Sequence, residues 1–152
     1  MLIARPTGLF TNNYKIADVH GDQVAELAIA MVKEGGRLLM DDKVLRIERE
    51  TMFSGPWQLK DGNEVLLEAF KVSMIKNRFE MSVKGASLEL APTSWTMRGF
   101  QVVGPDWSQL GTIKRPSLLS RRVNIELSDL VPKQAQLFLL FLSVVLWNRA
   151  QS

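Results

Sequence analysis

Short stretches in which apolar and polar residues alternate recur along the chain, separated by turns that contain glycine. In one such stretch, Phe79, Met81 and Val83 occupy every second position and polar residues lie between them. The stretches 45–50 and 123–127 repeat this pattern. Alternation with a period of two is typical of antiparallel strands that bury one face. The pattern therefore predicts a mainly β protein.

The turns between these stretches have the chemistry of β-hairpins. Asp61-Gly62 lies between two apolar runs, which is the strongest short-range signal for a hairpin. Glycine-containing turns at 20–22, 84–85 and 104–106 occupy equivalent places between other runs. This spacing predicts around ten short strands, which is enough for a sheet to close into a barrel.

Residues 22–34 admit two interpretations. They fit a helix that begins with Asp22 as its N-cap and ends at Gly35-Gly36. The inner stretch 24–31 also alternates around Glu26, which indicates a strand. We favour the strand and keep the helix as the alternative.

The last apolar run, 137–147, shows no alternation and contains Ser143 as its one polar residue. Pro132 stands where a helix begins, a position that suits proline. A bilayer crossing needs about 20 apolar residues, so this run of 11 residues is not expected to span a membrane. A helix that is apolar on every side must be buried on every side. The expected fold is a closed antiparallel β-barrel threaded by its own C-terminal helix, in one domain covering 1–152.

Three stretches carry a family likeness. A strand, Asp-Gly, strand unit spans 57–69, a glycine-linked strand pair spans 100–115, and the apolar run 137–147 follows. Together they resemble the tubby-like barrels, most closely the phospholipid scramblase and LURP-one-related group. The resemblance implies a barrel of about a dozen strands around a central helix. The cysteine-rich, proline-rich and acidic calcium-loop segments described for scramblases have no counterpart here, so the resemblance leaves the activity open.

The amino-acid composition excludes most kinds of catalytic site. The 152 residues include no cysteine and one histidine, which excludes disulfides, cysteine nucleophiles and thiolate metal sites. No phosphate loop, dinucleotide fingerprint or nucleophile elbow is present. We therefore expect no catalytic residues, no cofactor, no metal and no enzyme. The alternative, an enzyme with a site on the barrel exterior, would depend on His20 or on the pair Glu48 and Glu50.

Tryptophan is usually buried with its N–H hydrogen-bonded. Trp57, Trp95 and Trp107 are therefore interpreted as residues of the core or of the barrel rim rather than of a ligand site. Trp147 ends the apolar run and is expected to plug one end of the barrel.

The net charge of +3 conceals an uneven distribution. Residues 1–70 carry eight basic and eleven acidic side chains, whereas residues 71–152 carry eleven basic and five acidic ones. Lys114, Arg115, Arg121 and Arg122 are clustered, with no acidic residue from 107 to 125; they are the candidate residues for binding an anion or lipid. A hairpin with solvated charges and a contact with nucleic-acid phosphates are the alternatives. Since no aromatic residue lies from 108 to 137, stacking of single-stranded bases is not supported there.

The sequence thus predicts a non-enzymatic binding module that associates peripherally with anionic lipid through a basic surface. A protein-interaction or structural barrel is the alternative, and nucleic acid is disfavoured. A tail anchor is disfavoured because crossing would draw Lys133 or Arg149 towards hydrocarbon. Since the first residues lack the apolar core of a signal peptide, the expected location is the cytoplasm, with peripheral contact to a membrane.

Overall fold

Twelve β-strands and one long helix form the described part of the chain. The computed structural model describes residues 1–8, 12–30, 35–51, 55–72, 77–94, 96, 98–117 and 119–150. The strands are β1 (Leu2–Pro6), β2 (Asn13–Asp18), β3 (Gln23–Ala30), β4 (Gly35–Met40), β5 (Lys43–Arg49), β6 (Trp57–Asp61), β7 (Glu64–Lys71), β8 (Phe79–Val83), β9 (Ala86–Pro92), β10 (Gly99–Val103), β11 (Gln109–Lys114) and β12 (Val123–Leu127). A short 3₁₀ turn, η1 (Pro105–Trp107), joins β10 to β11, and the helix α1 (Lys133–Ala150) follows β12.

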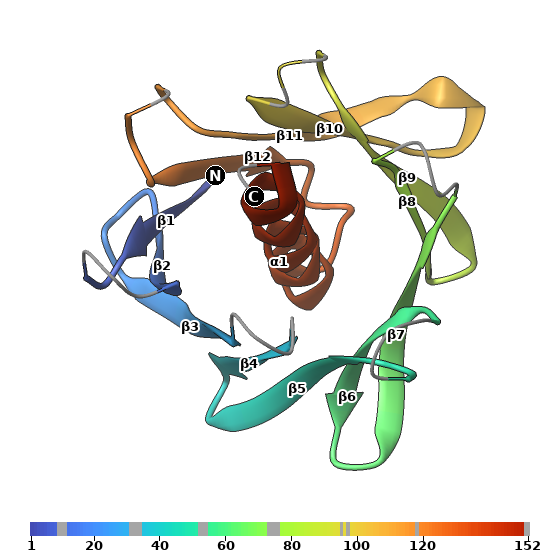
Figure 1. Cartoon of the computed structure of the whole chain (residues 1–152), viewed down its shortest axis with the longest axis horizontal. Helices are drawn as coiled ribbons and strands as arrows, with labels where there is room; N and C mark the ends of the chain where they lie inside the picture. The colour runs from blue at the N-terminus through green and yellow to red at the C-terminus, as the bar shows by residue number, and fades with distance from the viewer. Residues whose placement is uncertain are drawn as a thin grey trace.

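Each strand pairs antiparallel with its neighbours in the sequence, and the first strand pairs with the last. Leu2 lies opposite Ile125 and Ala4 lies opposite Val123, so β1 and β12 close the sheet into a barrel. Figure 1 shows this ring of strands around α1. The closed barrel with a C-terminal helix is confirmed, with more strands than the ten or so expected.

The alternating pattern decides which side chains face inward. In β8, Phe79, Met81 and Val83 are buried, whereas Glu80 and Ser82 between them are exposed. The ambiguous segment 22–34 forms β3 over Gln23–Ala30, so the strand interpretation is confirmed there. Residues 31–34 lie outside the described part of the chain.

The hairpin turns adopt the left-handed backbone that tight two-residue connections require. Gly62 has a φ of 60°, and Lys84 and Gly85 have φ values of 50° and 80°. Asp41 and Asp42 adopt φ values of 51° and 58° without a glycine. Aspartate tolerates this region because its short side chain forms local hydrogen bonds. The hairpins expected at these glycines are confirmed.

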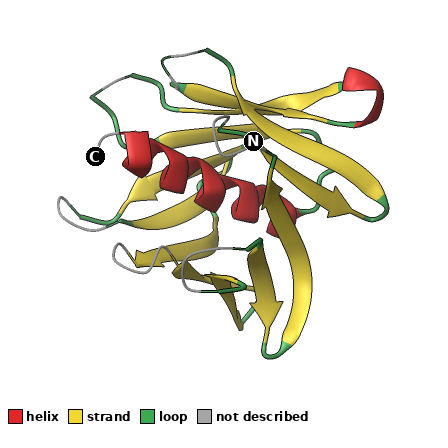
Figure 2. Cartoon of the chain, turned by 45° about the vertical axis from the view of Figure 1, so that its right-hand side comes forward, coloured by secondary structure: helices red, strands yellow, loops and turns green. Residues whose placement is uncertain are grey.

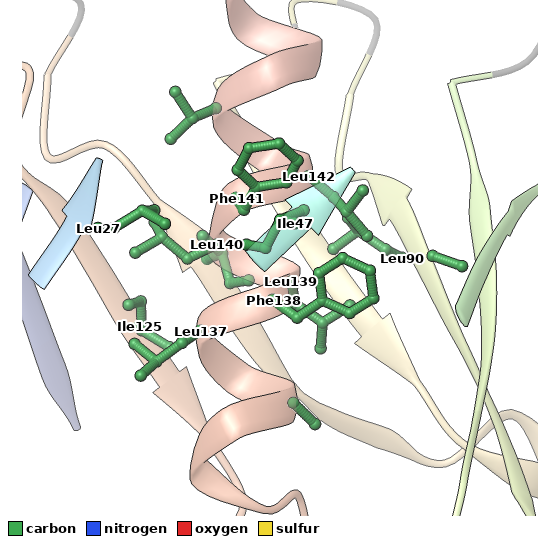
Figure 3. Packing of buried hydrophobic residues seen from close by; sticks show 14 of the residues in the cluster. Leu27, Ile47, Leu90, Ile125, Leu137, Phe138, Leu139, Leu140, Phe141 and Leu142 are labelled. Atoms are coloured by element: carbon green, nitrogen blue, oxygen red, sulfur yellow. The ribbon is translucent and has the colours of Figure 1, made fainter. Parts of the chain in front are cut away.

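The helix α1 fills the interior of the barrel. Every residue from Ala135 to Trp147 is buried, so no face of this stretch is left to solvent. Figure 2 shows the helix running through the barrel, and Figure 3 shows side chains of surrounding strands packed around it. The polar Ser143 is accommodated because its Oγ donates to the carbonyl of Leu139 at 2.8 Å. The space that holds a ligand in other small barrels is therefore occupied by the chain itself.

Close approach between helix and sheet depends on a small residue. A β-carbon at Gly36 would lie 2.7 Å from the carbonyl oxygen of Ala28 and 3.2 Å from the Phe141 ring. Glycine thus lets the ring pack against β4. On its other side Phe141 meets Trp57 edge-on, with ring centroids 5.4 Å apart.

Candidate anion-binding surface

Alternate connections of the barrel meet at the same end, because each strand runs antiparallel to the next. We call one end of the barrel the basic rim. It consists of the C-terminal end of α1 and the connections β1–β2, β3–β4, β5–β6, β7–β8, β9–β10 and β11–β12. The remaining connections, including β12–α1, form the acidic rim at the opposite end. Each rim is taken as its connections together with the residues of strand or helix that adjoin them.

Positive side chains gather at the basic rim. Those among the described residues are Arg49, Lys71, Arg78, Arg98, Lys114, Arg115, Arg121, Arg122 and Arg149. The described acidic residue at the same rim is Glu50. Arg78 is partly neutralised by Glu89 of β9, at 3.2 Å. This end of the barrel therefore presents a strong excess of positive charge.

The acidic rim has the opposite balance. Its described carboxylates are Asp18, Asp22, Asp41, Asp42, Asp61, Glu64, Asp106 and Asp129. Its described basic side chains are Lys43, Lys84 and Lys133, and His20 lies at the same rim. Lys43 lies 3.5 Å from Asp61. The molecule thus carries charges of opposite sign at the two ends of its barrel axis.

The four basic residues singled out from the sequence lie together on the basic rim, in and beside the β11–β12 connection, but they have different surroundings. Arg115 is half-buried, and its guanidinium lies over the Trp147 ring, 4.4 Å from the centroid. Arg121 donates from Nη1 to the carbonyl oxygen of Gly8 at 2.7 Å. Both side chains therefore fasten the connection to the barrel end. Lys114, in contrast, is exposed.

Tyr14 lies beside the two fastening arginines. Burial raises the pKa of the Tyr14 phenol, although the charges of Arg115 and Arg121 and a hydrogen bond from Arg121 oppose this. Burial also lowers the pKa of Arg115, and the like charge of Arg121 acts in the same direction. The phenol therefore stays neutral, and the two guanidinium groups share one half-buried region at the end of the helix.

Exposed cations extend this region across the neighbouring strands. Arg98 and Lys114 are both exposed, and the N–H of Arg115 donates to the carbonyl of Arg98 at 3.4 Å. Arg122 is half-buried. Its Nε and that of Arg115 are buried and find no hydrogen-bond acceptor within the described part of the chain. This surface combines the exposed charges of Arg98 and Lys114 with half-buried guanidinium groups, and guanidinium groups bind oxyanions through charge-assisted hydrogen bonds.

Sequence reasoning missed the cations that come from distant connections. Arg49, Lys71, Arg98 and Arg149 join the basic rim although they lie far from 114–122 in the sequence. The order of the strands around the barrel is the information that identifies these residues. In an up-and-down barrel every second connection reaches the same end, so charges must be summed over alternate connections.

The tryptophans divide into two groups. Trp57 and Trp147 are buried at 2% and 3% exposure, which confirms their expected packing. Trp107 is 79% exposed, so its expected place in the core or packed rim is wrong. It has a φ of 60° and lies in the η1 turn, in the β10–β11 connection at the acidic rim. Trp95 lies outside the described residues.

The residues named for the alternative enzyme do not come together. His20 is exposed in the β2–β3 turn, and its backbone N–H donates to Asp18 Oδ1 at 2.9 Å. Glu48 accepts from Lys60 Nζ at 2.8 Å, and this hydrogen bond lowers the pKa of its carboxyl. Glu50 is exposed beyond the end of β5. His20 and this carboxylate pair therefore lie at opposite ends of the barrel and do not form one site.

Described residues line surface hollows on the outer wall. One of about 380 Å³ lies beside the β4–β5 turn, between Glu26 and Asp42. Another, about 240 Å³, lies under Trp107 and is lined by Glu80 and Glu89. Glu80 accepts from Ser87 and Glu89 pairs with Arg78, so these carboxylates already have partners.

Within the described ranges, no three His, Cys, Asp or Glu side chains are grouped to hold a metal ion.

Across the described residues, no helix combines the length and apolar content that crossing a bilayer requires. No protein-family model, curated protein or solved structure matches the chain. We therefore infer the function from the geometry and charge of the two rims.

Proposed function

We propose that the protein is a non-enzymatic binding module whose basic rim associates peripherally with an anionic lipid surface. The observation that carries this proposal is the separation of charge along the barrel axis. Cations from β5, β7, β11 and α1 and from the connections between strands reach one end, and carboxylates occupy the other. A field of this kind steers the molecule towards a negative surface with one end first.

The size of the effect suits reversible attachment. Each Lys or Arg close to an anionic membrane contributes about 1 kcal/mol, and the attraction falls off within a Debye length of about 8–10 Å. When the basic rim touches a membrane, all of its exposed cations lie near that membrane. The acidic rim stays at the far end of the barrel. Several such contacts give measurable but salt-sensitive binding.

The shape of the charged surface favours a membrane over nucleic acid. Sequence readout of DNA inserts a helix or a two-stranded ribbon into the major groove. Here the long helix is buried inside the barrel (Figure 1). The cations are distributed over connections at one end of the closed ring. A broad, positively charged end fits an extended anionic surface.

Flotation with liposomes tests the proposal. The protein is mixed with vesicles of phosphatidylcholine alone or of phosphatidylcholine with phosphatidylserine, at low and high salt. The test variant is Arg98→Glu/Lys114→Glu, because both side chains are exposed at the basic rim. The matched control is Lys84→Glu/Lys133→Glu, which changes the net charge equally but at the acidic rim, where both side chains are exposed.

We expect the wild type and the control to float with phosphatidylserine vesicles at low salt, and the test variant to lose most of this binding. Equal loss in both variants would mean that net charge, and not the basic rim, determines binding. If no form of the protein binds vesicles, the lipid proposal is overturned in favour of a protein partner. Binding of an RNA or DNA probe in preference to vesicles would overturn it in favour of nucleic acid.

We also propose that the barrel belongs with the tubby-like barrels and that the protein is cytosolic with peripheral membrane contact. The motifs at 57–69 and 100–115 and the apolar run 137–147 support the first proposal. A closed twelve-strand barrel with its C-terminal helix inside is the arrangement that this resemblance implies.

A further inference from the structure

The tip of the β11–β12 connection carries an apolar side chain in full contact with solvent. Leu119 is 98% exposed, the highest value among the large apolar residues that are exposed. It lies between two basic pairs, Lys114 with Arg115 before it and Arg121 with Arg122 after it. No energetic gain within the protein explains an exposed leucine at this place, since its side chain is hydrated as it would be in the unfolded chain.

The base of this connection is fixed although its tip projects. Arg121 donates to the carbonyl of Gly8 at 2.7 Å and so ties the connection to the segment after β1. The N–H of Ser120 donates to the carbonyl of Ser117 at 3.3 Å. The N–H of Arg122 donates to Ser120 Oγ at 3.1 Å. These hydrogen bonds hold the described residues on both sides of Leu119.

We propose that Leu119 is an apolar anchor that enters the boundary between headgroups and acyl chains when the basic rim meets an anionic membrane. This inference rests on the proposed function and adds a contact that charge alone does not supply. An apolar residue surrounded by Lys and Arg has the composition of interfacial membrane contacts, in which the apolar group is buried and the cations meet anionic headgroups. The exposed Lys114 and the half-buried Arg122 flank the anchor and are placed to meet lipid phosphates.

A second exposed leucine provides the matched control. Leu130 is 82% exposed in the connection between β12 and α1, at the acidic rim. Single exposed apolar residues are common on protein surfaces, so exposure by itself does not distinguish the two leucines. Their electrostatic surroundings distinguish them, because Leu119 lies among cations and Leu130 follows Asp129.

Single-cysteine labelling tests the anchor directly, because the chain contains no cysteine of its own. Leu119→Cys and Leu130→Cys are each labelled with an environment-sensitive fluorophore and mixed with phosphatidylserine-containing vesicles. We expect a blue shift and an increase in emission for the label at 119, with quenching by lipids that carry a nitroxide on the acyl chain. The label at 130 is expected to show neither change.

Unlabelled variants give a second, independent readout. Leu119→Ser, which leaves the net charge unchanged, is expected to weaken the affinity for these vesicles about ten-fold, whereas Leu130→Ser leaves it unchanged. Both side chains are exposed, so both variants keep the fold. Vesicle binding with no spectral response at 119 and no loss in Leu119→Ser would overturn the anchor while leaving electrostatic binding by the basic rim intact. Absence of any vesicle binding by the wild type would overturn the proposed function and the anchor together.

Discussion

Arg115 shows how one basic residue can be part of a charged surface and of the protein core. Its guanidinium covers the Trp147 ring at 4.4 Å, and that ring packs on Phe100 with centroids 5.3 Å apart. The same side chain lies near the C-terminal end of α1, where positive charge is favourable next to the helix carbonyls. Arg49 repeats the arrangement over Trp57 at 5.2 Å. Some cations of the basic rim therefore shield the aromatic ends of the core.

Replacement of Arg115 should destabilise the protein, whereas replacement of its neighbour should not. Arg115→Ala removes a partly buried cation–π contact and the packing of the side-chain stem, so we expect a loss of about 1–2 kcal/mol in the free energy of unfolding. Lys114→Ala should change it by less than about 0.5 kcal/mol because Lys114 is exposed. Urea titration followed by tryptophan fluorescence measures both values. An equal effect of the two substitutions would contradict a structural role for Arg115.

At the scale of single elements, the strands and the helix could be read from the sequence because each has its own hydrophobic period. The alternation of Phe79, Met81 and Val83 predicted which side of β8 is buried, and the uninterrupted run 137–147 predicted a helix buried on all sides. Trp107 could not be placed in this way. It lies in the η1 turn with a left-handed backbone, and no hydrophobic period extends over this turn.

The buried helix makes a strong prediction for its centre. Leu140 is 0% exposed among side chains of the surrounding strands (Figure 3). Leu140→Asp would bury a carboxylate without a partner, which costs several kcal/mol and approaches the total stability of a domain. We expect this variant to lose its cooperative thermal transition by circular dichroism. The control Leu130→Asp, at an 82% exposed position, should melt at the same temperature as the wild type. A cooperative transition in Leu140→Asp would contradict a helix buried in the barrel.

At the scale of the whole molecule, the charge distribution could not be read from consecutive residues. The sequence indicated an acidic first half and a basic second half. In the barrel, Arg49 from the first half joins the basic rim, and Asp106 and Asp129 from the second half join the acidic rim. The true division follows the alternation of connections, which becomes visible only when the strand order is known. The candidate cluster at 114–122 lies on the basic rim but represents only part of it.

Closure of the barrel also couples the helix to every strand. Because β1 pairs with β12, the sheet has no open edge through which α1 can leave. The amide protons of buried helix residues are therefore expected to exchange with solvent only when the whole barrel unfolds. The connection Lys84-Gly85, which is exposed, should exchange through small local fluctuations.

Native-state hydrogen exchange measured in increasing urea tests this coupling. For the amides of residues 139–146, the free energy of exchange should equal the global free energy of unfolding and should fall with the same dependence on urea. The amides at 84–85 should exchange far faster and with little dependence on urea. Exchange of the helix amides at a lower free energy, with a weaker dependence on urea, would show that the helix opens separately from the sheet. In that case a ligand would be able to enter the interior of the barrel without unfolding of the sheet.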